Sequence, residues 1–262
     1  MAMNKAAIDK AVGILWQARL HCERLQSLPD DCRPATLEEG YAIQDAMAAS
    51  CGQKVAGWKI AATSTAGQRH IGVSEPIGGR LFADFVLRDG AVLPAAPLLM
   101  RVVEAEFAFR MGRNLDPRPA AYTKDEVLDA VAELHVAIEV PDGRFERFAE
   151  AGPGQIAADD AYASWFILGP KIVDWQKADL VNHPVRMMKN GKLGAEGSGA
   201  AVLGDPRIAL TWLANDRSKR GVGLRAGDIV TTGTCIKPLE IAANDRVTAD
   251  FGSLGRVSLT FA

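Results

Sequence analysis

The feature that most constrains this chain is an apolar run at residues 102–110 that two acidic residues interrupt with a period of two. Apolar and β-favouring residues in a short run that ends at a glycine predict a strand. Alternate side chains of a strand share a face, so Glu104 and Glu106 lie side by side, with Val103 and Phe107 on the opposite face. If the acidic face is enclosed, it requires basic partners, a raised pKa or a bound cation.

A third acidic residue, Glu139, stands near the end of the apolar run at 134–140, which stops at a Pro-Asp-Gly turn. An acidic residue at the end of a buried strand needs a partner. Three carboxylates together predict a Mg²⁺ or Mn²⁺ site, because hard divalent cations prefer carboxylate oxygens. The alternative is a solvated strand edge on which the glutamates form surface ion pairs. Joint burial of the three side chains distinguishes the two interpretations.

Composition narrows the class of protein. The 262 residues carry a net charge of −2 with 24% charged residues and no basic patch, so nothing indicates a nucleic-acid partner. No apolar run reaches the roughly 18 residues of a membrane span, and residues 1–10 do not form a signal peptide, so we expect a cytoplasmic protein. The four cysteines lack C-x-x-C spacing, which argues against structural zinc and a disulfide framework.

Lys59 lies inside the strand-like run at 55–64. Pointing inward, it needs a partner or a function, because a buried unpaired ammonium costs several kcal/mol. Alternation equally permits Lys59 to face solvent while its neighbours point inward. Glycines and Pro76 predict a loop at 67–79, of a length often used for lids and binding segments. The loop leads to Arg80 and Asp84.

The remaining pattern predicts both helices and strands, and the resemblance described below implies that they form a mixed α+β fold. Helical spacing predicts a helix from residue 4 to about 26, stopped near Pro29, and capping boxes predict helices that begin at Thr36 and Thr123, the latter running through Val131. Asp205 followed by proline predicts another helix start. Short strands are predicted at 228–234, 246–251 and 255–261.

The motifs in this order resemble the fumarylacetoacetase superfamily. They are Gly-Trp-Lys-Ile at 57–60, Gly-Arg-Leu-Phe-Ala-Asp at 79–84, Val-Glu-Ala-Glu at 103–106, Ala-Ile-Glu at 137–139, Ala-Asp at 158–159, Leu-Gly-Asp-Pro at 203–206, and the segment 224–234. Within this superfamily, the chain most resembles the branch of 2-keto-4-pentenoate hydratases and 4-oxalocrotonate decarboxylases. The resemblance covers residues 41–261.

The resemblance implies that Glu104, Glu106 and Glu139 bind one Mg²⁺ or Mn²⁺, and that Lys59 lies in the active site. It also implies that Asp159 and Thr234 border the substrate. The implied fold is a β-sandwich-like roll with flanking helices, and family members are homo-oligomers. We expect residues 1–95 to form a smaller, largely helical region that contributes Lys59 and a loop, and residues 96–262 to form the metal-binding core.

The chain departs from the branch after Asp159. The branch usually has Asn followed by small residues, whereas this chain has Asp160, Ala161 and Tyr162. A second carboxylate and a phenol beside the pocket leave the substrate open.

The implied activity is a hydratase that adds water to a 2-hydroxy-2,4-dienoate in aromatic catabolism. Lys59, Asp159 and Asp84 are the candidate catalytic residues, with Lys59, Arg80 and Thr234 as substrate-binding candidates. Decarboxylation of a 2-oxo diacid would use the same metal-stabilised enolate.

Two further alternatives remain. Hydrolysis of an acylpyruvate needs a histidine–acid pair, and His70 is the only candidate, in the predicted loop; the other histidines have no acid at suggestive spacing. A ligand-binding or structural relative is the non-enzymatic alternative.

Overall fold

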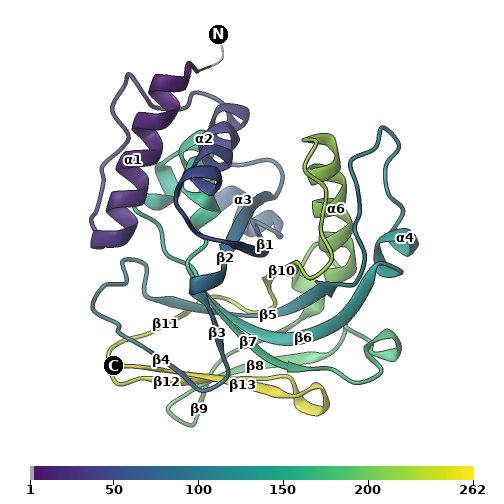
Figure 1. Ribbon diagram of the computed structural model, residues 1–262. Coiled ribbons are helices and arrows are strands. Elements are labelled where there is room, and N and C mark those ends of the chain that lie inside the picture. The colour runs from purple at the N-terminus through teal and green to yellow at the C-terminus, as the bar shows by residue number, and fades with distance from the viewer. Residues whose placement is uncertain (1–2) are drawn as a thin grey trace.

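The computed structural model describes residues 3–262 and has the predicted mixed architecture of helices and curled sheets (Figure 1). Two sheets pack against each other, and the N-terminal helices gather on the side of the larger sheet that is remote from the smaller one. The α-helices are α1 (Lys5–His21), α2 (Leu37–Ser50), α3 (Thr65–Ile71), α4 (Lys124–Leu128), α5 (Pro153–Ala158) and α6 (Pro206–Lys219).

The larger sheet carries the acidic residues. Its strands are, in spatial order, β2 (Ile77–Phe82), β1 (Val55–Ala61), β10 (Ile229–Thr234), β5 (Val102–Met111), β6 (Val131–Val140), β7 (Trp165–Lys171) and β3 (Val86–Arg88), with β11 (Leu239–Glu240) paired to β5. The edge strands β2 and β3 are joined by the single turn η1 (Ala83–Phe85). The sheet therefore curls strongly.

The smaller sheet covers one face of the larger one. Its strands are β4 (Ala91–Leu93), β13 (Arg256–Phe261), β12 (Arg246–Asp250), β8 (Pro184–Lys189) and β9 (Lys192–Ser198). The main core lies between the sheets and under α6, and it contains Val103, Ala105 and Phe107 with no exposed surface. The predicted apolar face of β5 is thus confirmed.

Residues 1–95 and 96–262 do not occupy separate sheets. Strands β1, β2 and β3 belong to the sheet of β5, and β4 pairs with β13. A second core packs α1, α2 and α5 together, with Leu15, Ile43 and Ile156 fully buried. None of the helices in the described part of the chain is long and apolar enough to cross a membrane.

Two helices end earlier than the sequence-based prediction. Helix α1 ends at His21, because Cys22 adopts a left-handed conformation (φ 54°) and its N–H donates to Ala18 O. Helix α4 stops at Leu128, since Val131 already begins β6.

The predicted loop at 67–79 is wrong in part. It contains α3, capped by Ser64, whose hydroxyl accepts a hydrogen bond from Gly67 N at 3.0 Å, and the first residues of β2. Ser64 and the left-handed Gly72 (φ 68°) were available as helix start and stop signals.

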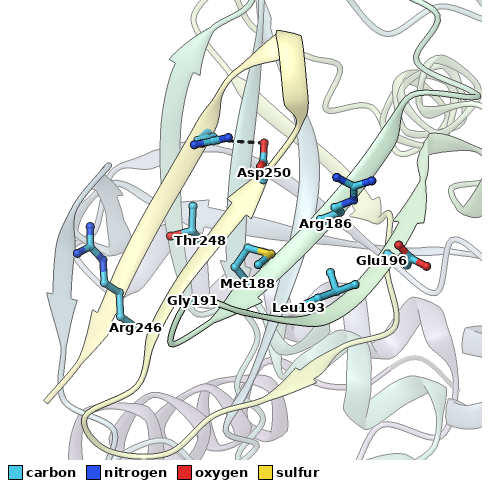
Figure 2. A pocket seen from close by; sticks show the side chains of 9 residues that line it. Arg186, Met188, Gly191, Leu193, Glu196, Arg246, Thr248 and Asp250 are labelled. Carbon is cyan, nitrogen blue, oxygen red and sulfur yellow. Dashed lines mark ion pairs between the residues drawn. The ribbon is translucent and has the colours of Figure 1, made fainter.

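The outer face of the smaller sheet is hollowed (Figure 2). This open hollow of about 660 Å³ is lined by Arg186, Arg246 and Arg256 together with Glu196 and Asp250. Arg256 forms an ion pair with Asp250 at 3.1 Å. The glutamates of β5 and β6 do not line it, so it is separate from the candidate site.

Candidate active site

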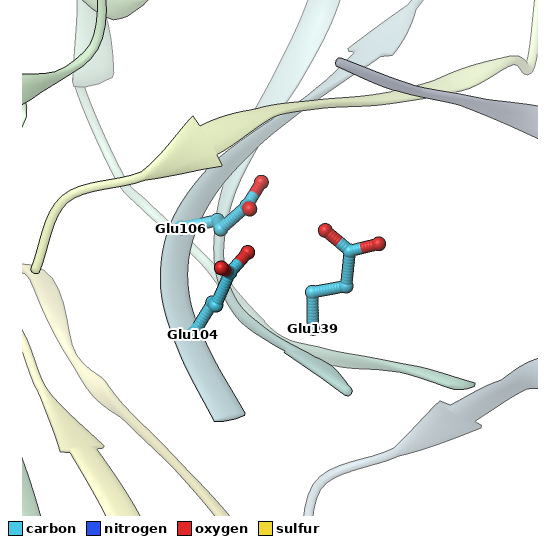
Figure 3. Close-up of side chains that lie close together, drawn as sticks. All are labelled: Glu104, Glu106 and Glu139. Atoms are coloured by element: carbon cyan, nitrogen blue, oxygen red, sulfur yellow. The ribbon is translucent and has the colours of Figure 1, made fainter. Parts of the chain in front are cut away.

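Strands β5 and β6 bring the three glutamates together. Glu104 pairs directly with Glu139 across the two antiparallel strands, and Glu106 follows on the same face of β5. Figure 3 shows the three carboxylates converging on one point. One carboxylate oxygen from each residue lies within 4.8 Å of the others. Glu106 and Glu139 are 0% and 1% exposed and Glu104 is half-buried, so the surface-charge alternative is excluded.

The neighbouring strand β10 holds Glu106 in place. Its Oε2 accepts hydrogen bonds from the Thr231 hydroxyl and from Gly233 N, the latter at 2.8 Å. Its Oε1 is buried without a hydrogen-bond partner. Oε1 of Glu139 also has no hydrogen bond, but it forms an ion pair with Lys59. Buried carboxylate oxygens normally have hydrogen-bond partners, so the free oxygen of Glu106 in a cluster of three carboxylates fits a cation-binding role.

The charges of the cluster also fit a divalent cation. When ionised, the three glutamates and Lys59 together carry a net charge of −2. Burial, together with repulsion from Glu139, raises the pKa of Glu104 to about 7. Burial and the charges of Glu139 and Glu104 raise the pKa of Glu106 well above its usual range. A bound divalent cation would offset this repulsion.

Lys59 points into the site rather than to solvent. It is 4% exposed, and its Nζ lies 3.1 Å from Glu139 Oε1 and donates to Ala161 O at 2.9 Å. Burial opposes its charge, but the three carboxylates, Glu139 foremost, outweigh burial and raise the pKa of Lys59. The residue is therefore a buried ammonium at the edge of the carboxylate cluster.

Of the other two predicted substrate-binding residues, Thr234 lies beside the cluster and Arg80 does not. Thr234 pairs with Glu106 across β10 and β5, which places it beside the cluster, and its hydroxyl donates to Ile236 O at 2.9 Å. Arg80 neighbours Trp58 rather than Lys59, and its guanidinium lies 4.7 Å from the Trp58 ring and donates to Gln44. The side chain of Arg80 thus faces the opposite side of the sheet from the glutamates.

Asp84 and Asp159 do not join the cluster. Asp84 is exposed in η1, which follows the last residue of β2, whereas Lys59 pairs with Gly79 in the middle of that strand. Asp159 is 1% exposed, but its Oδ1 and Oδ2 accept from Arg144 Nε at 2.6 Å and Arg144 N at 2.8 Å. Both oxygens of Asp159 are therefore engaged in a buried ion pair, which does not favour a role in proton transfer.

The two unusual residues after Asp159 also point away from the glutamates. Asp160 accepts a hydrogen bond from Arg80 N at 2.7 Å, and the Tyr162 hydroxyl donates to Phe148 O at 2.7 Å. Neither side chain contacts the carboxylate cluster. The expected second carboxylate beside the metal site is instead part of the packing between β2 and the turn η3 (Asp160–Tyr162).

Comparison with known proteins gives the family. Residues 82–262 match the family described as fumarylacetoacetate (FAA) hydrolase, C-terminal. The chain belongs to this family. A curated member, 2-keto-4-pentenoate hydratase from Burkholderia vietnamiensis, is 34% identical over 94% of this chain and 94% of its own length.

Decarboxylases of the fumarylacetoacetate hydrolase family are also similar. The 4-oxalocrotonate decarboxylase of Pseudomonas putida is 32% identical over 99% of this chain and 98% of its own length. A solved structure of 4-oxalocrotonate decarboxylase from Pseudomonas putida G7, complexed with magnesium and adipate, superposes with a TM-score of 0.91 at 28% identity, covering 100% of this chain and 99% of that chain. The fold of this chain is that of the family.

Several residues of this family member were missed in the sequence. Thr231 and Gly233 lie in the segment 224–234, but their hydrogen bonds to Glu106 were not predicted. The available signal for this contact was a threonine two residues before a glycine in a predicted strand. Arg144 follows the turn after β6 and holds Asp159. The carbonyl of Ala161, a partner of Lys59, has no sequence signal, because backbone groups carry none.

One histidine prediction is wrong. Glu133 lies on the same strand face as His135, two residues away, with Oε2 3.3 Å from Nε2. The other ring nitrogen, Nδ1, lies 3.0 Å from Gly169 O. Both ring nitrogens therefore lie within contact of oxygens of the protein itself, so the ring is engaged in structural contacts. His70, the candidate of the predicted loop, is exposed on α3.

Proposed function

We propose that this protein is a divalent-metal-dependent hydro-lyase that adds water to a 2-hydroxy-2,4-dienoate and yields a 4-hydroxy-2-oxo acid. The observation that carries the proposal is the buried cluster of three glutamates with Lys59 at its edge. Relatives that match nearly the whole chain at 30–34% identity are named 2-keto-4-pentenoate hydratase and 2-hydroxyhexa-2,4-dienoate hydratase, which supports the substrate class.

In this proposal Glu104, Glu106 and Glu139 hold Mg²⁺ or Mn²⁺. The solved decarboxylase relatives contain magnesium or calcium, which supports a divalent ion bound by oxygen ligands. When bound, the ion supplies Lewis-acid polarisation of the substrate's 2-oxygen. Thr231 and Gly233 fix the orientation of Glu106, so that its free Oε1 would be available to hold the ion.

Lys59 supplies positive charge where the substrate gains negative charge. Its buried ammonium, fixed by Ala161 O, can donate a hydrogen bond to the substrate's 2-oxygen as the hydroxyl proton leaves. The dienol thereby becomes the 2-oxo-3-enoate, with the proton gained at C5. Water then bonds to C4, which is conjugated to the 2-oxo group, and a proton is added at C3.

Decarboxylation is the second candidate, because a 4-oxalocrotonate decarboxylase matches at 32% identity and has a superposable fold. Loss of CO₂ from a 2-oxo diacid would use the same charge stabilisation. Acylpyruvate hydrolysis is not favoured, since both ring nitrogens of His135 are engaged and the residue lies four positions before Glu139 on β6.

The decisive experiment is a proton NMR time course with Mg²⁺ or Mn²⁺ and, in separate tubes, 2-hydroxypenta-2,4-dienoate and 2-oxohex-3-enedioate. A 4-hydroxy-2-oxo product from the first tube, absent with EDTA, is expected. Release of CO₂ from the second tube alone would move the assignment to the decarboxylase. Product formation that EDTA does not affect would contradict metal dependence.

We further propose that the protein is a homo-oligomer that acts on a free small molecule, as the family resemblance implies. Light scattering coupled to size-exclusion chromatography tests the assembly. A mass corresponding to one 28.0 kDa chain would contradict it.

A further inference from the structure

The turn η3 next to Lys59 has an unusual backbone. Asp160, Ala161 and Tyr162 are consecutive residues with side chains, and all adopt positive φ (57°, 51° and 61°). The left-handed region is unfavourable for such residues, because Cβ approaches the following carbonyl oxygen. A run of them persists only where the surrounding structure holds it, and such strain is concentrated at functional sites.

Several contacts hold the turn. Asp160 Oδ1 accepts from Arg80 N at 2.7 Å, and its Oδ2 lies 3.7 Å from Nη2 of the buried Arg19. Ala163 N donates to Asp160 O at 2.9 Å. The Tyr162 hydroxyl donates to Phe148 O. The carboxylate of Asp160 thus ties the turn to β2 on one side and to α1 on the other.

Strand β2 leaves space for the turn at Gly79. A Cβ at Gly79 would lie 2.2 Å from Asp160 O and 3.1 Å from the Cβ of Ala161. Gly79 is also the cross-strand neighbour of Lys59. The turn therefore packs directly against the strand pair that carries Lys59, and no side chain larger than hydrogen fits between them.

The strained turn directs one carbonyl at the ammonium of Lys59. Ala161 O accepts from Lys59 Nζ at 2.9 Å, while Glu139 lies on another side of the same nitrogen at 3.1 Å. A carbonyl is a neutral acceptor that metal binding to Glu139 does not alter. It can hold the ammonium in place whatever the charge state of the carboxylates.

We propose that η3 is a positioning element for Lys59 and that Asp160 is its principal positioning residue, acting through the Ala161 carbonyl. The proposal rests on the proposed function for its kinetic consequences only. Asp160 and Gly79 hold the turn, the turn holds the carbonyl, and the carbonyl holds the ammonium at the place where substrate charge develops.

The first test compares neighbouring glycines of β2. Gly79→Ala pushes the turn away from Lys59, so we expect kcat to fall at least about tenfold, with KM and Mn²⁺ affinity little changed. Gly78→Ala is the matched control, because its Cβ would meet the flexible Leu213 side chain at 3.1 Å and not the turn. Equal kcat values for the two variants would overturn the proposal.

A second pair serves if Gly79→Ala does not fold. Asp160→Ala removes the acceptor for Arg80 N, whereas Asp160→Asn keeps an oxygen at that position. We expect Asp160→Ala to lose kcat and Asp160→Asn to restore most of it, with Mn²⁺ affinity unchanged in both. A loss of kcat in proportion to the loss of folded protein would indicate a merely structural role and overturn the proposal.

An activity-free measurement separates this proposal from the proposed function. Buried, hydrogen-bonded ammonium groups exchange protons slowly, so the ¹⁵N-lysine spectrum should show a sharp Lys59 signal, assigned by its absence in Lys59→Gln. The signal should broaden in Asp160→Ala and remain in Asp160→Asn. If the wild type turns over neither substrate, the proposed function fails, but the Lys59 signal still tests the positioning role of η3. A signal that is unaffected in Asp160→Ala would refute positioning by η3.

Discussion

At the scale of single residues, Glu106 has the most defined environment among the three glutamates. It is fully buried, and one of its oxygens is bound by a hydroxyl and a backbone N–H from β10 while the other lacks a partner. Glu106 lies beside Glu104 and Glu139 (Figure 3), so this asymmetry leaves one oxygen of Glu106 available within the cluster. We therefore expect the position and charge of this carboxylate to decide whether a cation binds.

We expect Glu106→Gln to abolish metal-dependent turnover while the protein stays folded, because the amide keeps the shape but provides no negative charge. In the wild type, Mn²⁺ at 100 times its Kd should stabilise the fold by about 2.7 kcal/mol. Calorimetry should show this stabilisation as a higher Tm with Mn²⁺ in the wild type and in the exposed control Glu196→Gln, but not in Glu106→Gln. Undiminished turnover in Glu106→Gln would contradict the metal assignment.

Asp159 tests the distinction between a catalytic and a structural carboxylate. Because both its oxygens bind Arg144, Asp159→Asn should destabilise the protein by about 3–5 kcal/mol, the usual effect of breaking a buried ion pair. Urea unfolding measures the loss, and turnover per folded molecule should remain. A stable Asp159→Asn protein without turnover would return Asp159 to the catalytic residues.

Asp160 should contribute to the pH dependence of stability. Burial raises its pKa from 3.8 to about 6 despite the opposing charge of Arg19. The native state thus retains a proton that the unfolded chain has lost, so stability falls as pH rises from about 4 to 6, by up to about 3 kcal/mol. Asp160→Asn should lack this part of the slope when urea midpoints are compared from pH 4 to 8. Parallel curves would show that Asp160 titrates normally.

At the scale of elements, a group of cationic and aromatic side chains joins α6 to α2 and to strand β1, which carries Lys59. Arg217 is 1% exposed, and its guanidinium lies 4.8 Å from the rings of both Tyr41 and Trp58. The guanidinium of Arg80 lies 4.7 Å from the same Trp58 ring. The neighbour of Lys59 on β1 therefore contacts two guanidinium groups, which connects α2, β1, β2 and α6.

We expect Arg217→Met to lower the free energy of unfolding by about 2–4 kcal/mol, because it removes the ion pair with Asp216 and two cation–π contacts. Arg217→Lys should recover only part of this, since an ammonium lacks the planar stacking surface. Arg256→Met, at an exposed ion pair, is the control and should change stability by less than about 0.5 kcal/mol. Urea unfolding measures the free energy of unfolding of the three variants. Equal losses of this free energy in Arg217→Met and Arg256→Met would show that stacking is unimportant.

At the scale of the whole molecule, the candidate site depends on segments from both ends of the chain. Lys59 comes from β1, the glutamates from β5 and β6, and Thr231 from β10. Strand β1 pairs with β10 in parallel and with β2 antiparallel. The first 95 residues therefore complete the sheet that carries the three glutamates.

A chain cut to residues 96–262 should accordingly not fold stably by itself. It would lack β1, β2 and β3 of the larger sheet and β4 of the smaller one, which would expose the long edges of β7, β10 and β13. Circular dichroism and amide NMR dispersion measure the outcome. A well-dispersed spectrum from this fragment would establish residues 96–262 as an independent domain.

Period-two patterning in the sequence was sufficient to predict the shared face of Glu104 and Glu106 and the strand of Glu139, because these follow from local backbone geometry. The mixed fold was expected from the family resemblance. The helix starts at Thr36, Thr123 and Asp205 were also predicted, since capping depends on neighbouring residues. The direction of Lys59 was not determined by the pattern, because alternation permitted both faces.

Only the tertiary structure decided which polar residues meet. Arg144 binding to Asp159 and Arg80 turning to Trp58 both depend on which segments pack together. The carbonyl of Ala161 could not be predicted at all, because a backbone group gains its role from the left-handed turn that three long-range contacts hold. Local sequence sets the elements, whereas the partners of buried charges are set by the fold that encloses them.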